Sequence, residues 1–298
     1  MPLTVVIAGA SGFLGTHLSE ELVRRGHAVV ALVRRPTSAA DESTWDPYAG
    51  AYDRAVVERA DVVVNLAGTP TAGNPHSSRW ARELRESRVT TTRVLAEAVA
   101  GSERKPAYLA GNGISYYGDH GDEVVTEASD SRGDALLTRV TRDWQAAAQP
   151  AVDAGARVCF LRTAPVMDES SPPLKQLALM TRLGLAAKLG DGHQRMPMIS
   201  LRDWVGAAAH LAENDDLSGP ANLCCPETPT NAEFTDALAR MVGRKAFLSV
   251  PRFAIEAGAG AMAPEVLGSV NARPMVLEDA DYRFADRTVH EVLRAALR

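Results

Sequence analysis

Three glycines close to the start of the chain have the spacing needed to hold a pyrophosphate. Gly9 allows a sharp reversal, Gly12 lets the backbone approach a phosphate without a Cβ in the way, and Gly15 lets a helix lie close to a strand. Free N–H groups and the positive dipole at the start of that helix attract the phosphates. The pattern predicts a dinucleotide site whose cofactor-binding residues include Gly9, Ser11, Gly12, Phe13, Leu14 and Gly15.

The residues on either side of the glycines predict the elements that position them. An apolar run over 5–8, too short for a helix, comes before the turn, and Leu14, Leu18 and Leu22 follow it at helical spacing. The alternative is an ordinary glycine-rich turn without a ligand. The order of strand, turn and helix at the very start of an α/β unit favours the dinucleotide site.

Two arginines predict which dinucleotide binds. A second strand is expected over 27–33, and Arg34 and Arg35 follow it. In a fold of this kind, the residue about twenty positions beyond the glycines meets the adenosine ribose, where an acid favours a free 2′-hydroxyl and an arginine favours a 2′-phosphate. The first acid here is Asp41. The arginines therefore favour NADP(H), although two solvated arginines at a strand end are the alternative.

Two further strands end in residues that suit a cofactor and a reaction. A buried strand over 61–68 closes with Leu66, Ala67 and Gly68, whose small side chains leave room for a dinucleotide, unless Gly68 merely ends the strand. The next strand, over 106–111, leads to the catalytic candidates Ser115, Tyr116 and Tyr117. The alternative for the two tyrosines is packing beneath a loop.

The remaining pattern predicts an α/β fold, a Rossmann-type doubly wound parallel sheet followed by a smaller C-terminal region. Residues 1–165 form the NADP-binding domain, to which 199–224 return, and 166–198 with 225–298 form the smaller region. Residues 37–60 are expected to be irregular apart from a short helix near 53–59. The polar loop before residue 198 holds His193 and Arg195, candidates for binding an anionic substrate unless the loop is simply solvated.

Composition argues against several classes of partner. A net charge of −5 gives no general attraction to nucleic acid or to an anionic membrane, and no apolar run is long enough to span a bilayer. The three cysteines show neither metal spacing nor a disulfide framework, so no metal is expected. These features predict a cytoplasmic protein, a monomer or homodimer, that acts on a small molecule.

Taken together, these motifs resemble the extended short-chain dehydrogenase/reductases, and among them the atypical members labelled NAD(P)-dependent nucleoside-diphosphate-sugar epimerases. The matches run in the same order from about residue 3 to residue 297. The resemblance implies a dinucleotide-binding sheet and a late substrate domain for something like a nucleotide sugar. The shared motifs are Gly9-x-x-Gly12-x-x-Gly15, Trp45-Asp46-Pro47, Asn65-Leu66-Ala67-Gly68, Ser87-Arg88-Val89 with Thr91, Tyr116-Tyr117-Gly118, Leu161-Arg162-Thr163, Gly190-x-Gly192 before Asp203, and Gly219-Pro220-x-Asn222 ahead of Thr230-Asn231-x-Glu233-Phe234.

One departure from the larger family bears on the chemistry. Most short-chain reductases carry Tyr-x-x-x-Lys, in which the lysine lowers the pKa of the tyrosine so that it can pass a proton. No such motif occurs in this chain, and counting back from Trp144 places Leu137 in the tyrosine slot and Thr141 in the lysine slot. The labelled subgroup also lacks the pair. Asn112 stands where an active-site serine is expected, and Ser87 and Asn112 complete the predicted cofactor-binding set.

Two functions remain open at this point. The first is an NADP(H)-dependent oxidoreductase or epimerase-like enzyme that moves hydride to or from a small polar substrate. Proton transfer then falls to Tyr117, Tyr116 or Ser115, or is unnecessary if the substrate is already electrophilic, as an iminium ion is. The second is a catalytically silent protein that keeps NADP(H) as a sensing or structural ligand and acts by binding a partner.

Overall fold

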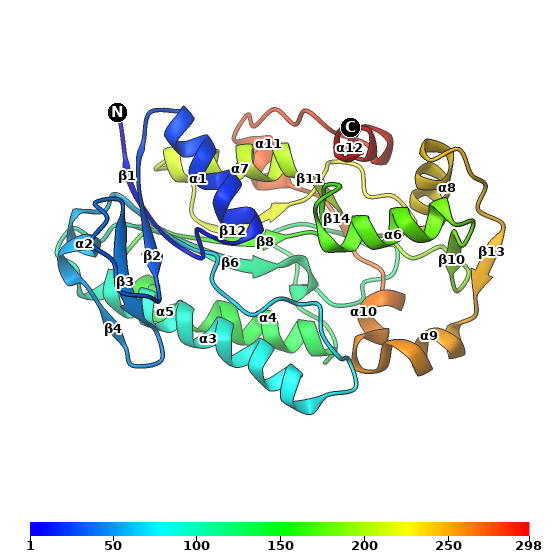
Figure 1. Ribbon diagram of the computed structural model, residues 1–298, viewed down its shortest axis with the longest axis horizontal. Helices are drawn as coiled ribbons and strands as arrows, with labels where there is room; N and C mark the ends of the chain where they lie inside the picture. The colour runs from blue at the N-terminus through cyan, green and yellow to red at the C-terminus, as the bar shows by residue number, and fades with distance from the viewer. Residues whose placement is uncertain (298) are drawn as a thin grey trace.

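An eight-stranded sheet forms the centre of the computed structural model, which describes residues 1–297 (Figure 1). Its strand order is β12-β8-β6-β5-β1-β2-β3-β4, and every neighbouring pair is parallel except β3 and β4. The order reverses at β1, so the crevice between the carboxyl ends of β1 and β5 is the place where such sheets bind ligands. The strands are β1 (Thr4–Ala8), β2 (Ala28–Val33), β3 (Glu42–Asp46), β4 (Ala51–Tyr52), β5 (Val62–Asn65), β6 (Ala107–Gly113), β8 (Val158–Thr163) and β12 (Gly219–Leu223).

Helices cover both faces of this sheet, which confirms the predicted doubly wound α/β class. One face packs against α1, α7 and α11, and the other packs against α2, α3 and α5. The bounds are α1 (Phe13–Arg24), α2 (Arg54–Arg59), α3 (Ser78–Gly101), α4 (Leu136–Ala146), α5 (Gln149–Asp153), α7 (Leu201–Glu213) and α11 (Met275–Asp279).

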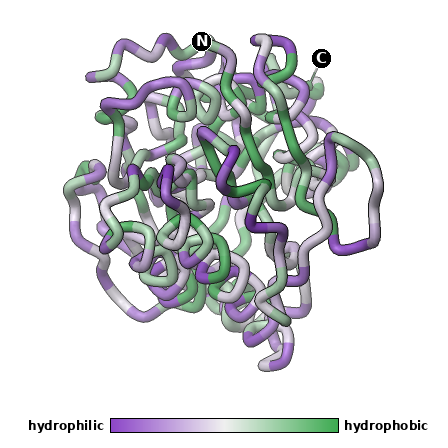
Figure 2. The backbone as a smooth tube through the Cα atoms, turned by 90° about the vertical axis from the view of Figure 1, so that its left-hand side faces the viewer, coloured by the Kyte–Doolittle hydropathy of each residue, from purple (hydrophilic) through white to green (hydrophobic). Residues whose placement is uncertain are grey.

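Burial on both faces explains why the central strands are apolar throughout. In β1, Val5 and Ile7 belong to the core beneath α1 and α7, whereas Val6 and Ala8 belong to the core beneath α3. All four are fully buried. Each Val or Ile side chain buried in this way contributes about 1.5–3 kcal/mol. Figure 2 shows the hydrophobic colour concentrated on interior segments, with hydrophilic segments mostly on the outer loops.

One stretch differs from the expected structure. The sequence predicted irregular chain over 37–53, but residues 42–46 form β3, which pairs in parallel with β2. Its side chains alternate, and Ser43 and Trp45 are buried while Thr44 and Asp46 are exposed. Because only two residues point inward from this edge strand, its apolar content is too low to stand out among polar neighbours. The short helix predicted near 53–59 is present as α2.

The later part of the chain builds a smaller region beside the carboxyl edge of the sheet. Its core joins Met167, Leu174, Met198, Phe234 and Leu293. The remaining elements are the 3-10 turn η1 (Ile114–Tyr116), β7 (Val124–Val125), β9 (Val166–Met167), α6 (Pro172–Arg182), β10 (Ala187–Leu189), β11 (Ile199–Ser200), α8 (Asn231–Met241), β13 (Leu248–Val250), α9 (Arg252–Ala259), the 3-10 turn η2 (Gly260–Met262), α10 (Ala263–Leu267), β14 (Asn271–Ala272) and α12 (Val289–Ala296).

The turn between β1 and α1 leaves no space for side chains at two of its glycines. A Cβ on Gly15 would lie 2.1 Å from the carbonyl oxygen of Gly9. A Cβ on Gly9 would lie 2.7 Å from the carbonyl carbon of Leu66, and Gly9 has a φ of +84°. The first glycine therefore brings β1 against the end of β5, and the third brings α1 against the turn.

We expect Gly15→Ala to destabilise the fold, because the methyl group would meet backbone atoms that cannot move without shifting α1. The loss should be about 1–3 kcal/mol or more in the free energy of unfolding, measured by urea denaturation. Gly101→Ala is the matched control, since a Cβ there meets nothing within 4 Å and alanine favours a helix end at least as well as glycine. Equal unfolding free energies for the two variants would contradict this account of the turn.

Candidate functional site

The glycine turn presents backbone N–H groups at the crevice between β1 and β5. Gly12 is the N-cap of α1, and no side chain among the described residues caps that helix. Ser11 and Gly12 are exposed, while Phe13 and Leu14 are half-buried. An uncapped helix start that faces an open crevice is the arrangement that binds phosphate groups.

The two predicted arginines differ in what they contact. Both are exposed and follow directly after β2. An Nη atom of Arg35 lies 2.7 Å from a carboxylate oxygen of Glu42, in β3. Among the described residues, Arg34 has no hydrogen-bond or ion-pair partner, so its guanidinium is available to a 2′-phosphate, whereas that of Arg35 already has an anion.

A buried amide holds the predicted cofactor loop at the end of β5. Asn65 is completely buried, and its Oδ1 accepts the N–H of Ala67 at 3.1 Å. Its Nδ2 donates to the hydroxyl of Thr92, on α3, at 2.8 Å. The same hydroxyl accepts the indole N–H of Trp144, on α4, at 2.7 Å. These bonds fix Leu66, Ala67 and Gly68 relative to two helices, and a buried network whose polar groups are all paired is rigid.

Ser87 lies beneath this loop rather than in the open crevice. Its side chain is 5% exposed, and its hydroxyl accepts the N–H of Thr69 at 3.1 Å. The neighbouring Arg88 donates to the carbonyl oxygen of Thr69 at 2.9 Å and stacks over the ring of Trp144. Burial lowers the pKa of Arg88 to about 10. The geometry favours loop support for Ser87 over the direct cofactor contact expected from the sequence.

Tyr117 is completely buried, unlike a residue that must touch a substrate. Its hydroxyl donates to Oδ1 of Asn222 at 2.7 Å and accepts from a guanidinium N–H of Arg162 at 2.8 Å. Burial raises the pKa of Tyr117 to about 12, although the charge of Arg162 opposes that shift. Here the geometry favours the alternative of a packed tyrosine beneath a loop, and a structural rather than a catalytic role.

Arg162 and Glu127 complete the buried group around Tyr117. The guanidinium of Arg162 stacks over the ring of Tyr116 at 3.6 Å, which orients that half-buried tyrosine. Glu127 accepts the backbone N–H of Asn222 at 3.0 Å. Burial raises the pKa of Glu127. The sequence analysis included Arg162 and Asn222 in shared motifs but predicted no role for either.

Asn112 also turns away from the crevice. It is 3% exposed, and its Nδ2 donates to the carbonyl oxygen of Thr141 at 3.2 Å. Thr141, in the lysine slot, bonds through its own hydroxyl to the carbonyl oxygens of Leu137 and Thr138. Asn112 therefore joins β6 to α4, and this position favours packing over the cofactor contact predicted for it.

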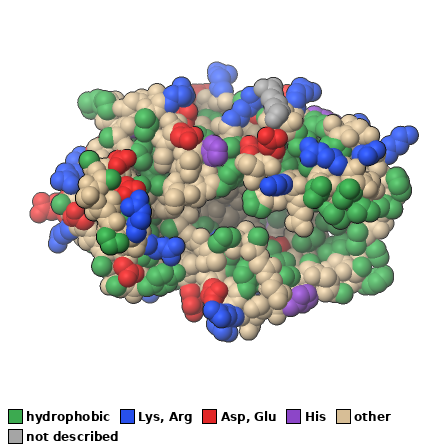
Figure 3. Space-filling model, in the orientation of Figure 1, with side chains coloured by type: hydrophobic (Ala, Val, Ile, Leu, Met, Phe, Trp, Pro, Cys, Tyr) green, Lys and Arg blue, Asp and Glu red, His purple; other side chains and the backbone are tan. Residues whose placement is uncertain are grey.

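Ser115 and Tyr116 remain as half-buried hydroxyls at the carboxyl edge of β6. The hydroxyl of Ser115 hydrogen-bonds the carboxylate of Glu265 in α10, a residue for which the sequence analysis predicted no role. Figure 3 shows this face hollowed between the part that carries α6 and the part that carries α3 and α4.

The predicted anion-binding pair is split. Arg195 lines a pocket of about 500 Å³ together with Arg273 and His290, and its Nη1 donates to the carbonyl oxygen of Thr228. His193 is exposed and is not among the residues that line this pocket. The structure therefore gives Arg195 a pocket position that His193 does not share.

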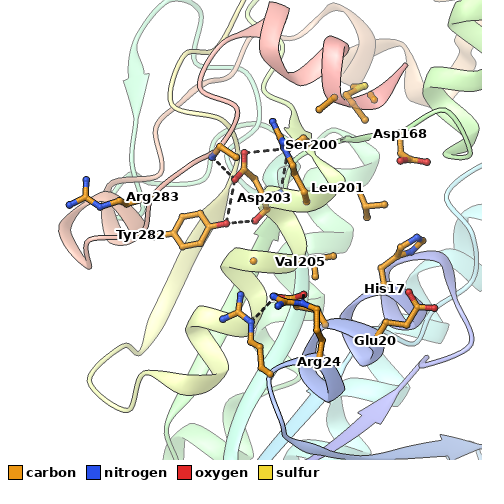
Figure 4. A pocket seen from close by; sticks show the side chains of 18 residues that line it. His17, Glu20, Arg24, Asp168, Ser200, Leu201, Asp203, Val205, Tyr282 and Arg283 are labelled. Carbon is orange, nitrogen blue, oxygen red and sulfur yellow. Dashed lines mark hydrogen bonds and ion pairs between the residues drawn. The ribbon is translucent and has the colours of Figure 1, made fainter. Parts of the chain in front are cut away.

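A larger pocket, of about 610 Å³, lies between α1, the start of α7 and the segment that holds Tyr282 (Figure 4). Several of its charged groups already have partners within the chain. Asp203 accepts the backbone N–H groups of Ala285 and Asp286, each at 2.8 Å. Arg24 pairs with Glu21 at 2.7 Å. The Asp203 contacts hold the C-terminal segment on the sheet domain.

Residues 1–297 contain neither a membrane-spanning helix nor a cluster of metal ligands. No helix in that range combines the length and apolarity that crossing a bilayer requires. Within the same range, no three side chains of His, Cys, Asp or Glu gather closely enough to hold a metal ion. Cys159, Cys224 and Cys225 are free thiols, and all three are buried.

Comparisons with known proteins agree with this geometry. Residues 5–224 match the model of the NAD dependent epimerase/dehydratase family. Residues 250–296 match a domain of unknown function, DUF1731. An epimerase family protein of Mycobacterium leprae, ML0860, is 37% identical over 98% of this chain and 95% of its own length.

Two solved structures have folds similar to that of this chain. Human epimerase family protein SDR39U1, solved with NADPH, has a TM-score of 0.87 and 28% identity over 99% of both chains. A nucleoside-diphosphate sugar epimerase from Corynebacterium glutamicum has a TM-score of 0.82 and 32% identity over all of this chain and 58% of its own. With three-quarters of its length inside the family model and a relative of this identity along almost its whole length, the chain belongs to the NAD dependent epimerase/dehydratase family.

Proposed function

We propose that this protein is an NADP(H)-dependent oxidoreductase that moves hydride to or from a small polar substrate held in the hollow beside β6. The observation that carries the proposal is the uncapped start of α1 at the strand-order reversal, with the unpaired Arg34 at the end of the next strand. The first suits a pyrophosphate, and the second suits a 2′-phosphate.

The described residues fit the cofactor. The turn from Gly9 to Gly15 would hold the pyrophosphate, Arg34 the 2′-phosphate, and the loop Leu66–Gly68 the middle of the dinucleotide. When bound, the nicotinamide supplies hydride chemistry. The NADPH in the structure of the human relative supports the same preference here.

A nucleotide sugar is the substrate class that the relatives suggest. The Corynebacterium relative is titled a nucleoside-diphosphate sugar epimerase. In this chain, Arg195 and Arg273 line one pocket in the smaller region and could meet a diphosphate there. This role extends the anion-binding role expected for Arg195, whereas the exposed His193 does not line that pocket.

One observation favours the silent, cofactor-keeping alternative. Tyr117 is buried, and its hydroxyl already donates one hydrogen bond and accepts another. Leu137 has no ionisable group, and the hydroxyl of Thr141 is bonded to a carbonyl oxygen of its own helix, so the usual proton-transfer pair is missing. A silent protein would bind NADPH and leave it unoxidised with every carbonyl, imine and sugar nucleotide tested. The enzyme proposal requires oxidation of NADPH by at least one of them.

We expect wild-type protein to bind NADPH more tightly than NADH, and Arg34→Ala to remove that preference. A charged hydrogen bond from arginine to phosphate is worth about 1.5–3 kcal/mol, or roughly a ten- to hundredfold change in Kd. Titration of both nucleotides by fluorescence measures the ratio. Arg35→Ala is the matched control and should change the ratio far less, because Arg35 already pairs with Glu42.

A wild-type preference that survives Arg34→Ala would show that another group recognises the 2′-phosphate. Failure of both nucleotides to bind would refute the proposed function altogether. Binding without turnover across the substrate panel would leave the silent alternative as the better account.

We expect Tyr117→Phe to cost stability rather than catalysis. Removing the hydroxyl leaves a buried guanidinium N–H and a buried amide oxygen without that partner, which costs about 1–3 kcal/mol. Turnover of whichever compound oxidises NADPH should fall less than about tenfold, because a true general acid is worth a hundredfold or more. Tyr116→Phe is the control, since among the described residues the Tyr116 hydroxyl has no hydrogen-bond partner. Thermal unfolding and initial rates separate the two effects, and a hundredfold loss of turnover in Tyr117→Phe would restore its catalytic role.

A further inference from the structure

A segment of the smaller region crosses to the carboxyl edge of the sheet. We call residues 252–268, which include α9, η2 and α10, the C-terminal strap. On one side, the strap contacts the loop before α3, where Ala261 donates its N–H to the carbonyl oxygen of Pro75 at 3.2 Å. This contact brings a distant part of the chain beside the loop that follows β5.

The chain that follows the strap is fastened to the loop after η1. The carbonyl oxygen of Ser269 accepts the backbone N–H of His120 at 2.9 Å. The hydroxyl of Ser269 donates to the carbonyl oxygen of Gly121 at 2.6 Å. Immediately beyond, β14 pairs in parallel with β7. The strap is therefore fixed near its middle, through Ala261, and just beyond its C-terminal end, through Ser269, to the loops that follow β5 and β6.

Between these attachments, the strap places one carboxylate on the start of α4. Glu265 accepts the N–H of Leu137 at 2.8 Å, and it also accepts from the backbone of Thr138 and the hydroxyl of Ser115. The N-cap residue of α4, Ala135, has no side chain that could do this. Glu265 thus bridges the helix that should carry the catalytic tyrosine and the turn that carries the remaining serine.

The Glu265 carboxylate lies beside the position where a proton-transfer group is missing. Leu137 occupies the tyrosine slot and has no ionisable group, while Tyr117 is buried behind Arg162. The carboxylate of Glu265 reaches the backbone of the tyrosine slot itself and touches Ser115. Its side chain is half-buried, so part of it stays open to a small molecule.

We propose that Glu265 is the catalytic residue that gives a proton to the substrate and takes it back, with Ser115 as its hydrogen-bonding partner. The proposal rests on the proposed function and names the proton-transfer group of that same site. It also gives the segment that matches a domain of unknown function a part in the chemistry.

For a carbonyl substrate, Glu265 would act as the general acid during reduction. The reduced nicotinamide dinucleotide provides a hydride, with its electron pair, to the carbonyl carbon and is oxidised. The O–H bond of protonated Glu265 breaks, and its proton goes to the carbonyl oxygen, which leaves an alcohol and a carboxylate. In the reverse direction, the carboxylate accepts the proton of the alcohol as hydride leaves its carbon.

The surroundings of Glu265 suit a group that holds a proton. Burial raises the pKa of Glu265, and the hydrogen bonds from Leu137, Thr138 and Ser115 oppose the shift. Titratable groups on the segments packed around it include His76 before α3, Tyr116 on η1, Asp119 and His120 after η1, and Asp134 and Arg139 around the start of α4. A raised pKa keeps more of the carboxyl protonated near neutral pH than in an exposed glutamate.

Comparison of NADP⁺ with NADPH tests whether Glu265 faces the reacting ring. The two nucleotides share the 2′-phosphate, but only the oxidised nicotinamide ring is positively charged, and a nearby positive charge lowers the pKa of a carboxyl. Binding of NADP⁺ should therefore release more protons than binding of NADPH, by a measurable fraction of one proton per site. Isothermal titration calorimetry in buffers of different ionisation enthalpy measures this difference between about pH 5 and 8.

Two variants separate this role from a structural one. Glu265→Gln keeps an oxygen that can accept the Leu137 N–H, so folding and nucleotide affinity should change little while the extra proton release disappears. Glu256→Gln, on the exposed side of the same strap and paired with Arg252, should behave as wild type. Equal proton release from wild type and Glu265→Gln would overturn the assignment, whereas loss of nucleotide binding by the wild type would refute the proposed function and this inference together.

Turnover supplies the second readout. With the carbonyl compound that oxidises NADPH fastest, we expect Glu265→Gln to lower kcat at least about a hundredfold with a much smaller change in the Kd of NADPH. In the wild type, the rate of reduction should fall as pH rises through the raised pKa of Glu265, because the proton donor is lost. That limb of the pH profile should be absent in Glu265→Gln, and an unchanged profile with an unchanged kcat would overturn the proposal.

Discussion

The approach of the Gly15 backbone to the Gly9 carbonyl oxygen is the constraint on which the rest of the site depends. Because a Cβ on Gly15 would lie 2.1 Å from that oxygen, α1 starts as close to β1 as a polypeptide allows. The same turn presses Gly9 against Leu66 at the end of β5. One crowded junction therefore sets the position of the helix start, the width of the crevice and the path of the second loop.

Buried polar groups then hold the crevice walls from behind. Asn65, Thr92 and Trp144 connect β5 to two helices, and Arg162, Tyr117 and Asn222 connect the next strands to each other. Each of these side chains is costly to bury unless it is paired. Because these groups are paired with one another, residues that could take part in catalysis, judged from their type, instead make the structure rigid.

The sequence predicted best where the signal is local. The strand, glycine turn and helix at residues 5–22 and the arginines after β2 depend on neighbours within a few positions, and the structure has these elements in that order. Local sequence could not predict that Tyr117 is buried and paired while Tyr116 and Ser115 stay half-buried. This arrangement depends on Arg162, 45 residues away from Tyr117, and on Asn222, 105 residues away. The residues next to the tyrosines in the sequence do not indicate that Arg162 and Asn222 will contact Tyr117.

Glu265 is the extreme case of this limit, because it meets Leu137 across 128 residues of sequence. Nothing in a tail of short helices indicates that one acid among many will reach the sheet edge. Its placement follows from the contacts of Ala261 with Pro75 and of His120 with Ser269, which are backbone bonds available to almost any sequence. A site that takes its acid from the strap, rather than from α4, needs the smaller region to be folded and docked before it can pass a proton. In this arrangement α4 contributes the backbone N–H of Leu137, and the ionisable group comes from the C-terminal strap.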